Sequence, residues 1–391
     1  MKKFFALLVT LLLAIALVGC SSANTDGGDE EAVSNEPIKI GLIQDITGAT
    51  STLGNMVYEG AKYAAGLINE AGGVNGREIE VLVYDTAAST DEALNGFTKA
   101  VTEDEVSAII GPPVGNIAHA LKTFTEDYDV PVLCFAGDIN IYKKEDGTTY
   151  KNMFLFQPDL NTNAGVMYNW AVGDGGLTSF GVLYNESNSY SVTIAEEFLK
   201  RAEADGTTIT DTVVFNADST DFVTLLTKVT ANNPDAIFAP CYTAKNILIV
   251  QAAEQIGYTG KIIMGLDACS PFQDKAGVSD LSNAVWVNNV DEEDATIQEI
   301  AKYILDTEGI EVTNKFFMGY DAMNILAQVI GEVGDDPVAI RDAVENLSSY
   351  QGLTGLLTMD PSTHAISPAA GMIIGTFDGL TPTKIGRYYA E

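Results

Sequence analysis

The sequence has 391 residues, a formal net charge of −33 and a hydrophobic content of 46%. A surface this acidic excludes nucleic acid as a partner, because phosphates require a basic patch that could not persist in such a field. Some 355 residues follow the N-terminal segments described next, which is more than one hydrophobic core usually holds. We therefore expect two domains in the body of the chain.

The first 36 residues are expected to export and anchor the chain. Two lysines precede an apolar run at residues 4–18, which is too short to span a bilayer comfortably and lacks a charged stop-transfer flank. The tetrapeptide LVGC at 17–20 resembles a bacterial lipobox, which implies cleavage before Cys20 and a lipid anchor on its thiol; a cysteine there by chance is the alternative. We predict a signal peptide at 1–19, whose loss changes the net charge to about −35, and a lipidated Cys20 with a flexible tether through 36.

The body of the chain alternates strand-length apolar runs with segments of helical periodicity. The first series predicts strands at 38–44, 79–85, 106–111 and 130–136, and helices at 55–71, 91–103 and 117–127. The second series predicts strands at 180–184, 212–215, 236–240, 261–265 and 284–290, and helices at 164–172, 192–204, 221–231 and 243–256. Helices near 294–306, 314–331 and 337–347 follow, and "GLLTMD" and "MIIGTFDG" read as two short strands. This order predicts an α/β fold of two doubly wound parallel-sheet lobes.

Several motifs in order give a more specific resemblance. They include "INEAGGVNGR" near residue 70, "AIIGPP" at 108–113, "YNESNSYS" at 184–191, "NPDAIFAP" at 233–240 and "GYDAMNILA" at 319–327. The set resembles the leucine/isoleucine/valine-type (branched-chain amino acid) periplasmic binding proteins, which have the type I extracellular solute-binding fold. The resemblance covers the chain from Pro37 to its C-terminus.

The resemblance implies two lobes joined by a multi-stranded hinge, with a ligand cleft between them. We expect lobe 1 at 37–158 and 290–366, lobe 2 at 159–289 and 367–391, and hinge crossings near 157–161, 287–291 and 366–371.

The implied function is capture of a small amino acid, branched-chain by default, and its delivery to a membrane permease of an ABC importer. The protein is then a monomer, lipid-anchored at the outer face of the cell membrane or periplasmic. Two alternatives stay open: a binder of a carboxylate-free cationic or hydroxyl-rich ligand, and a sensor that partners a membrane receptor.

Carried over position by position, the resemblance implies ten ligand contacts. Lobe 1 offers Leu53 and the two loops that hold Val114, Gly115 and Asn116, and Ala136, Gly137 and Asp138. Lobe 2 offers Tyr190, Tyr242 and Asp267. Backbone N–H groups would take the carboxylate of the amino acid, and Asp267 its ammonium group. The family usually has a serine near Gly115, and that hydroxyl is missing here.

Asp138 departs from the family pattern, which usually has Thr or Ser at this place. A carboxylate beside the ligand's carboxylate repels it or must take up a proton. Two interpretations stay open: Asp138 turns outward and caps the next helix, or it faces the cleft and favours a ligand without a carboxylate.

The sequence carries no enzyme signature such as G-x-S-x-G, H-E-x-x-H, a P-loop or C-x-x-C. Its two histidines, His119 and His364, have no partner at metal-ligand spacing, so we expect no metal and no cofactor. Cys134, Cys241 and Cys269 lie in or at the end of apolar runs and are expected to be small buried residues. We therefore expect a binding protein with no catalytic residues.

Overall fold

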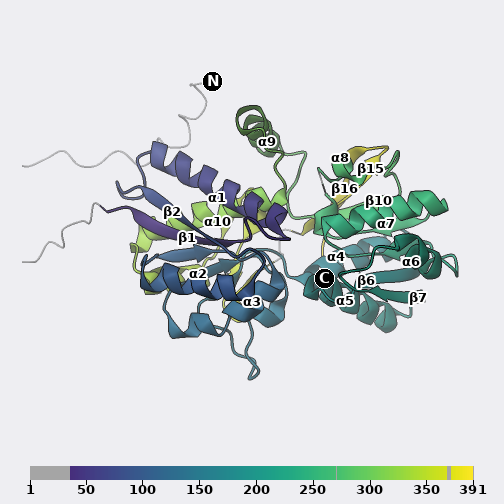
Figure 1. Cartoon of the computed structure of the whole chain (residues 1–391), viewed down its shortest axis with the longest axis horizontal. Coiled ribbons are helices and arrows are strands. Elements are labelled where there is room, and N and C mark those ends of the chain that lie inside the picture. The colour runs from purple at the N-terminus through teal and green to yellow at the C-terminus, as the bar shows by residue number, and fades with distance from the viewer. Residues whose placement is uncertain (1–35, 270, 368–370, 391) are drawn as a thin grey trace, which may run out of the picture. The chain divides into compact units, whose positions relative to one another are not determined.

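The computed structural model describes residues 36–269, 271–367 and 371–390; the predicted signal peptide, almost all of the tether and Cys20 lie outside them. From Glu36 onward the chain forms one compact unit. Within the described part, no helix has the length and apolar character needed to cross a membrane. Its strands form two seven-stranded sheets and a small hairpin, which confirms the predicted α/β fold with two lobes (Figure 1).

The sheet of lobe 1 has the strand order β13-β14-β5-β4-β3-β1-β2. All its neighbouring strands pair in parallel except β13, which runs antiparallel to β14 at one edge. The strands are β1 (Ile38–Gln44), β2 (Ile79–Asp85), β3 (Ala108–Ile110), β4 (Val132–Cys134), β5 (Met153–Leu155), β13 (Met359–Asp360) and β14 (Ala365–Ile366).

The sheet of lobe 2 has the order β16-β15-β10-β9-β8-β6-β7. Its first five strands along the chain pair in parallel, and β15 and β16 join antiparallel at one edge. The strands are β6 (Ser179–Asn185), β7 (Thr208–Phe215), β8 (Ala236–Phe238), β9 (Lys261–Ile263), β10 (Ala284–Asn288), β15 (Met372–Asp378) and β16 (Thr381–Tyr388). A hairpin of β11 (Tyr350–Gly352) and β12 (Gly355–Leu357) stands apart from both sheets.

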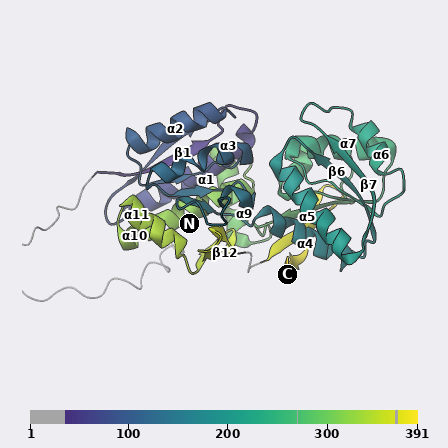
Figure 2. The same ribbon diagram turned by 90° about the horizontal axis from the view of Figure 1, so that it is seen from below.

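Helices cover both faces of each sheet, as Figures 1 and 2 show. Those of lobe 1 are α1 (Ser51–Glu70), α2 (Thr90–Thr102), α3 (Gly115–Leu121), α9 (Ala295–Glu308), α10 (Asn314–Val333) and α11 (Pro337–Glu345). Those of lobe 2 are α4 (Leu160–Val172), α5 (Ser189–Asp205), α6 (Phe222–Val229), α7 (Thr243–Ile256) and α8 (Phe272–Ala276). Short 3-10 turns η2 (Phe124–Asp127), η3 (Ile139–Ile141) and η4 (Leu266–Ala268) complete the set.

Each sheet separates two hydrophobic cores, because side chains alternate between the faces of a strand. In β3, Ala108 and Ile110 pack into the core beneath α1 and α10, while Ile109 packs into the core beneath α2 and α3. In lobe 2, Ile262 and Ile263 divide in the same way between the two cores of that lobe. Burial on both faces explains why these strands read as continuous apolar runs.

The chain passes between the two sheets three times. It does so between β5 and α4, between β10 and α9, and between β14 and β15. Residues 368–370, between β14 and β15 in the sequence, lie outside the described residues.

Some elements differ from those expected. β5, α8, β11, β14 and β16 were not predicted, and the helix expected at 117–127 is α3 followed by the 3-10 turn η2. The run "GLLTMD" forms two strands, β12 and β13, instead of one. β16 escapes prediction because Pro382 and Lys384 interrupt its pattern, and both residue types are tolerated on an edge strand such as this one.

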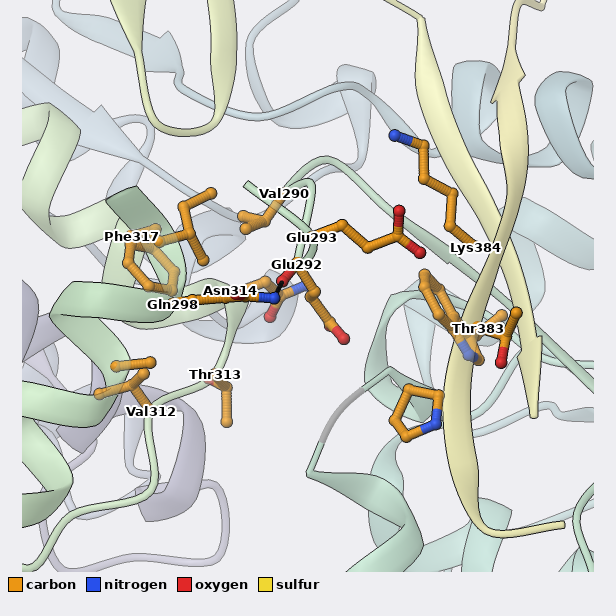
Figure 3. A pocket seen from close by; sticks show the side chains of 14 residues that line it. Val290, Glu292, Glu293, Gln298, Val312, Thr313, Asn314, Phe317, Thr383 and Lys384 are labelled. Carbon is orange, nitrogen blue, oxygen red and sulfur yellow. Dashed lines mark hydrogen bonds between the residues drawn. The ribbon is translucent and has the colours of Figure 1, made fainter. Parts of the chain in front are cut away.

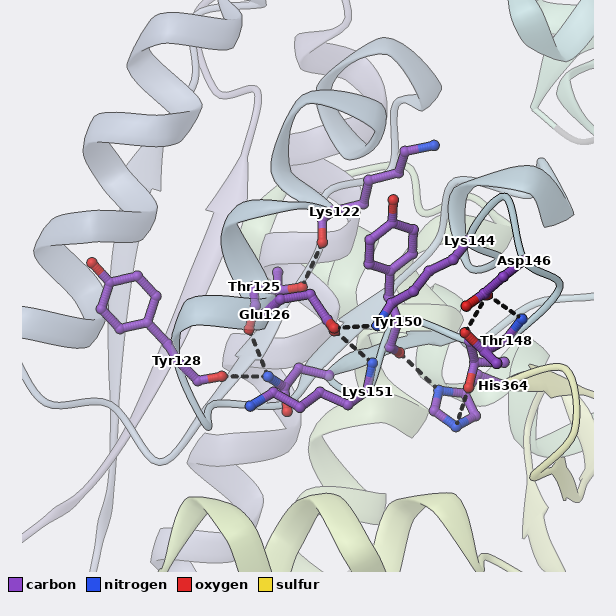
Figure 4. Close-up of polar contacts among 12 residues, drawn as sticks. Lys122, Thr125, Glu126, Tyr128, Lys144, Asp146, Thr148, Tyr150, Lys151 and His364 are labelled. Atoms are coloured by element: carbon purple, nitrogen blue, oxygen red, sulfur yellow. Dashed lines mark hydrogen bonds and ion pairs between the residues drawn. The ribbon is translucent and has the colours of Figure 1, made fainter.

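His364 is a structural residue at the edge of the lobe 1 sheet. Its ring stacks on Phe154 with centroids 4.6 Å apart, and Nδ1 lies 3.1 Å from the Tyr150 carbonyl oxygen (Figure 4). Its own carbonyl oxygen accepts a hydrogen bond from the Leu155 N–H at 2.7 Å. These contacts hold β14, which comes late in the sequence, against β5.

The helices α1 and α10 approach closely because each has a glycine at the contact. A β-carbon on Gly60 would lie 1.9 Å from the Phe316 carbonyl oxygen, and one on Gly319 would lie 2.1 Å from the Val57 carbonyl oxygen. Backbone atoms cannot move aside as a flexible side chain can. The close approach also sets the position of the first turn of α10, which enters the ligand cleft described below.

We predict that Gly60→Ala lowers the free energy of unfolding by about 2 kcal/mol or more, because the new methyl group overpacks a backbone contact. Gly66→Ala is the matched control in the same helix, since a β-carbon there meets nothing within 4 Å. That control should leave stability unchanged or raise it by about 0.5 kcal/mol. Urea unfolding followed by circular dichroism measures both, and equal effects of the two substitutions would contradict the packing described here.

Candidate functional site

A cavity between the lobes gathers eight of the ten predicted contact residues. It contains about 380 Å³ of atom-free space, part of it open to solvent. The eight residues are Leu53, Gly115, Ala136, Gly137, Asp138, Tyr190, Tyr242 and Asp267. They come from α1, the start of α3 and the loop after β4 in lobe 1, and from α5, the loop before α7 and η4 in lobe 2. The cavity lies at the carboxyl ends of parallel strands, where ligands bind in open α/β sheets.

Val114 and Asn116 do not line this cavity. Val114 is the residue before α3 and packs partly against the core on that side of the sheet. Asn116 is exposed in the first turn of α3. From this segment the cavity is lined by Gly115, between them, and by Pro113 just before Val114.

The lobe 1 wall of the cavity is mostly backbone. The Gly137 N–H makes no hydrogen bond to any residue that the structure describes. Gly115 is the first residue of α3, so its N–H lacks a partner within the helix. These two N–H groups can donate to a carboxylate.

Ser189 from lobe 2 stands where the hydroxyl missing from Gly115 would be expected. A β-carbon built on Gly115 would lie 2.5 Å from Ser189 Oγ. The start of α5 therefore meets the start of α3 across the cleft, and the hydroxyl group at this place is supplied by the opposite lobe. Ser189 was not among the predicted contacts.

Asp138 combines parts of both interpretations left open by the sequence. Its carboxylate caps η3, accepting from the Asn140 N–H at 3.0 Å, and its Oδ2 lies 3.0 Å from His119 Nε2. The side chain is nevertheless buried and lines the cavity. Burial acts to raise the pKa of Asp138, but the hydrogen bonds from His119 and Asn140 outweigh it and lower the pKa below its ordinary value. The carboxylate is thus held by its own lobe, which reduces its repulsion of a ligand carboxylate.

We predict that Asp138→Asn lowers the free energy of unfolding at pH 7 by about 1–2 kcal/mol, because the charged hydrogen bonds are lost. The folded-state pKa of Asp138 lies below the unfolded value, so this contribution is present above the unfolded pKa. It is lost as the pH falls through the lowered folded-state pKa.

Unfolding curves of both proteins between pH 7 and pH 2 measure this difference. Asp218→Asn is the control, since Asp218 is exposed in the loop after β7. A difference that persists undiminished at pH 2 would contradict the assigned contacts.

The lobe 2 wall is aromatic and carries one carboxylate. The rings of Tyr190 and Tyr242 stack with centroids 4.9 Å apart, and the Tyr190 hydroxyl accepts from the Leu266 N–H at 3.2 Å. This contact ties α5 to η4, on which Asp267 lies. Burial raises the pKa of both tyrosines, so both hydroxyls remain neutral donors.

Asp267 is a buried carboxylate, with 9% of its surface exposed. Burial raises its pKa, against the opposing effects of the Lys315 charge and the Tyr190 hydroxyl. No cation lies within ion-pair distance of its oxygens among the described residues. A ligand ammonium group at this position would supply the missing partner.

Lys315 is the most informative lining residue that sequence reasoning missed. It lies in the first turn of α10, and it lines both the cavity described above and a second, adjoining one of about 420 Å³. The second cavity shares Leu53, Asp267 and Lys315 with the first. The signal in the sequence that could have indicated Lys315 is a lysine directly followed by the apolar pattern of a buried helix.

A larger groove lies elsewhere, near the passages between the lobes (Figure 3). It has about 870 Å³ of atom-free space and is lined by residues such as Val312 and Phe317 on one side and Thr383 and Lys384 on the other. Lys384 is paired with Asp291 at 2.6 Å. None of the predicted contact residues lines this groove, so its size does not make it the ligand site.

Comparisons with known proteins agree with this geometry. The family model described as "Periplasmic binding protein" matches residues 37–379, so the chain belongs to the periplasmic binding protein family. A leucine-, isoleucine-, valine-, threonine- and alanine-binding protein of Pseudomonas aeruginosa is 24% identical over 92% of this chain and 93% of its own. The predicted resemblance to the branched-chain amino acid type of this family is confirmed.

Solved structures share the fold. A branched-chain amino acid transporter substrate-binding protein of Streptococcus pneumoniae, in complex with isoleucine, has a TM-score of 0.79 and 22% identity, covering 90% of this chain and 99% of that one. A solute-binding protein of an ABC transporter from Rhodopseudomonas palustris, in complex with 3,4-dihydroxybenzoic acid, has a TM-score of 0.79 and 19% identity, covering 91% and 98%. Proteins of this fold therefore bind chemically different ligands, so the fold alone does not identify the ligand of this chain.

Proposed function

We propose that this protein is the solute-binding component of an ABC importer and that it captures an α-amino acid in the cleft between its lobes. The observation that carries the proposal is the buried Asp267 carboxylate, which faces the cavity opposite free backbone N–H groups of lobe 1. Together they match the two opposite charges of an amino-acid head group. Membership in the solute-binding family supports binding without turnover.

In this proposal each lobe takes one end of the head group. The ligand carboxylate accepts from the N–H groups of Gly115 and Gly137 and from the Ser189 hydroxyl. The ammonium group donates to Asp267, and the Tyr190 and Tyr242 rings cover the bound ligand. Because only the closed arrangement completes both halves, ligand binding favours closure, and the closed form is what a permease would recognise.

The alternative of a ligand without a carboxylate assumed that Asp138 is a second acidic side chain in the cleft with no partner in the protein. The His119 and Asn140 contacts hold that carboxylate within lobe 1. An amino acid is therefore favoured over a cationic or hydroxyl-rich ligand. Within amino acids, the branched-chain type is the starting expectation from the relatives.

We predict that Asp267→Asn weakens amino-acid binding by roughly 30-fold or more, because a buried charged hydrogen bond is lost. Because burial raises the pKa of Asp267, wild-type affinity should begin to fall on acidification at a higher pH than an exposed aspartate would give. Isothermal titration calorimetry with the twenty L-amino acids, from pH 8 to pH 4, measures both effects.

The control for this experiment is Asp218→Asn, which should bind like the wild type at every pH. Equal affinity of the Asp267→Asn variant and the wild type, with the same pH profile, would remove Asp267 from the site and contradict the proposal.

We also propose that Cys20 anchors the protein to the outer face of the membrane through an attached lipid, with residues 21–36 as tether. The support is the lipobox resemblance of residues 17–20. More than one acyl chain on one residue gives a stable anchor.

We predict that Cys20→Ser moves the protein from the detergent phase to the aqueous phase of a Triton X-114 partition of bacterial cells. The Cys134→Ser variant serves as the control, because Cys134 is buried in β4 and should leave partitioning unchanged. Recovery of the Cys20→Ser variant in the detergent phase would contradict a lipid on this residue.

A further inference from the structure

Lys315 is a buried cation in the cleft that has no partner of its own. Only 7% of its surface is exposed, and it lines both adjoining cavities. Among the described residues, the Lys315 Nζ makes no hydrogen bond, and no carboxylate oxygen lies within 4.0 Å of it. The backbone N–H of Lys315, by contrast, donates to Thr313 Oγ1 at 3.2 Å. An unpaired buried ammonium group is costly unless something else supplies an anion.

The position of Lys315 in its helix adds to that cost. It occupies the first turn of α10, a helix of 20 residues whose N-terminal end is positive in the helix dipole. A cation is unfavourable at this end. Neither helix stability nor burial therefore accounts for a lysine at this place, which points to a role in the cleft.

Asp267 does not fill the role of partner. Its charge and that of Lys315 act on each other, but their atoms are not within ion-pair distance. In the proposed function Asp267 receives the ligand's ammonium group. A neutral amino acid would then place its ammonium group beside Lys315 and leave that lysine without an anion.

We propose that the ligand is an amino acid whose side chain carries a second carboxylate and that this carboxylate pairs with Lys315. This inference rests on the proposed function and deepens it. With such a ligand the charges of Asp267 and Lys315 are both matched: the ammonium group pairs with Asp267, one carboxylate with the backbone N–H groups of lobe 1, and the other with Lys315.

The second cavity has a mixed polar and apolar lining. Besides Lys315 it is lined by Thr243, by the exposed Thr52 and Lys275, and by apolar side chains such as those of Leu266 and Phe272. The Thr243 hydroxyl already donates to the Asp267 carbonyl oxygen at 3.0 Å, whereas the Thr52 hydroxyl can donate to a carboxylate and Lys275 adds a second cation from lobe 2. A purely aliphatic side chain would leave the buried Lys315 without an anion.

The test compares L-glutamate with L-glutamine, and L-aspartate with L-asparagine, by titration calorimetry. Each pair differs in little more than the charge of the side chain. In the wild type, one of the acidic members should bind at least tenfold more tightly than its amide. In Lys315→Met that preference should fall to near one or reverse, and L-leucine should bind more tightly than it does to the wild type.

Lys302→Met is the matched control, because Lys302 is exposed on α9 and pairs with Asp306 on its own helix. It should keep the wild-type preference. Lys315→Gln provides a second variant of similar length, and thermal unfolding of each variant checks that it is folded. The wild-type comparison of acid with amide does not depend on any variant.

Equal binding of acid and amide by the wild type overturns this inference, as does an unchanged preference in folded Lys315→Met or Lys315→Gln. If neutral amino acids still bind in a manner that depends on Asp267, the proposed function stands while this inference fails. If no L-amino acid binds the wild type, both fail together.

Discussion

The organisation of the cleft depends on one buried carboxylate, that of Asp267. A carboxylate removed from water must be protonated or must find a cation, because its charge is otherwise too costly. Burial raises its pKa, and the nearest compensating charge, on Lys315, comes from the opposite lobe. In the proposed function the stability of the closed cleft is thus tied to the cation that reaches Asp267, and this couples ligand capture to closure.

The fold places this carboxylate by means of backbone packing. The stacked Tyr190 and Tyr242 rings and the hydrogen bond from Leu266 hold η4 against α5. On the other side, the glycine contacts between α1 and α10 set where the first turn of α10 begins. Packing between these elements therefore places Asp267 and Lys315 along the same two cavities. In the proposed function the free space there holds the ligand.

The α/β class and two-lobe organisation were predictable because the signals are periodic. Buried parallel strands give continuous apolar runs, and amphipathic helices separate them. Elements without that contrast were missed: β5 has three residues, and β16 alternates exposed and half-buried residues at the edge of its sheet. Such strands are stabilised by their neighbours, which the local sequence does not contain.

The sequence was sufficient to predict which chain segments form the site, but it was less reliable for the individual side chains. Motif order led to eight residues that share one cavity, but Val114 and Asn116 flank it without lining it. The His119 partner of Asp138 is 19 positions away, and Ser189 meets Gly115 across the cleft. Lys315 joins Asp267 only because the chain returns to lobe 1 after β10. Contacts between distant segments of this kind are a property of the tertiary structure.

The most direct measurement is a crystal structure of the protein grown with the L-amino acid that binds it most tightly. We expect that ligand to lie between the lobes, with its ammonium nitrogen within about 3.2 Å of an Asp267 oxygen and its α-carboxylate on the N–H groups of Gly115 and Gly137. A ligand in the groove of Figure 3, or one that contacts a single lobe, would contradict it.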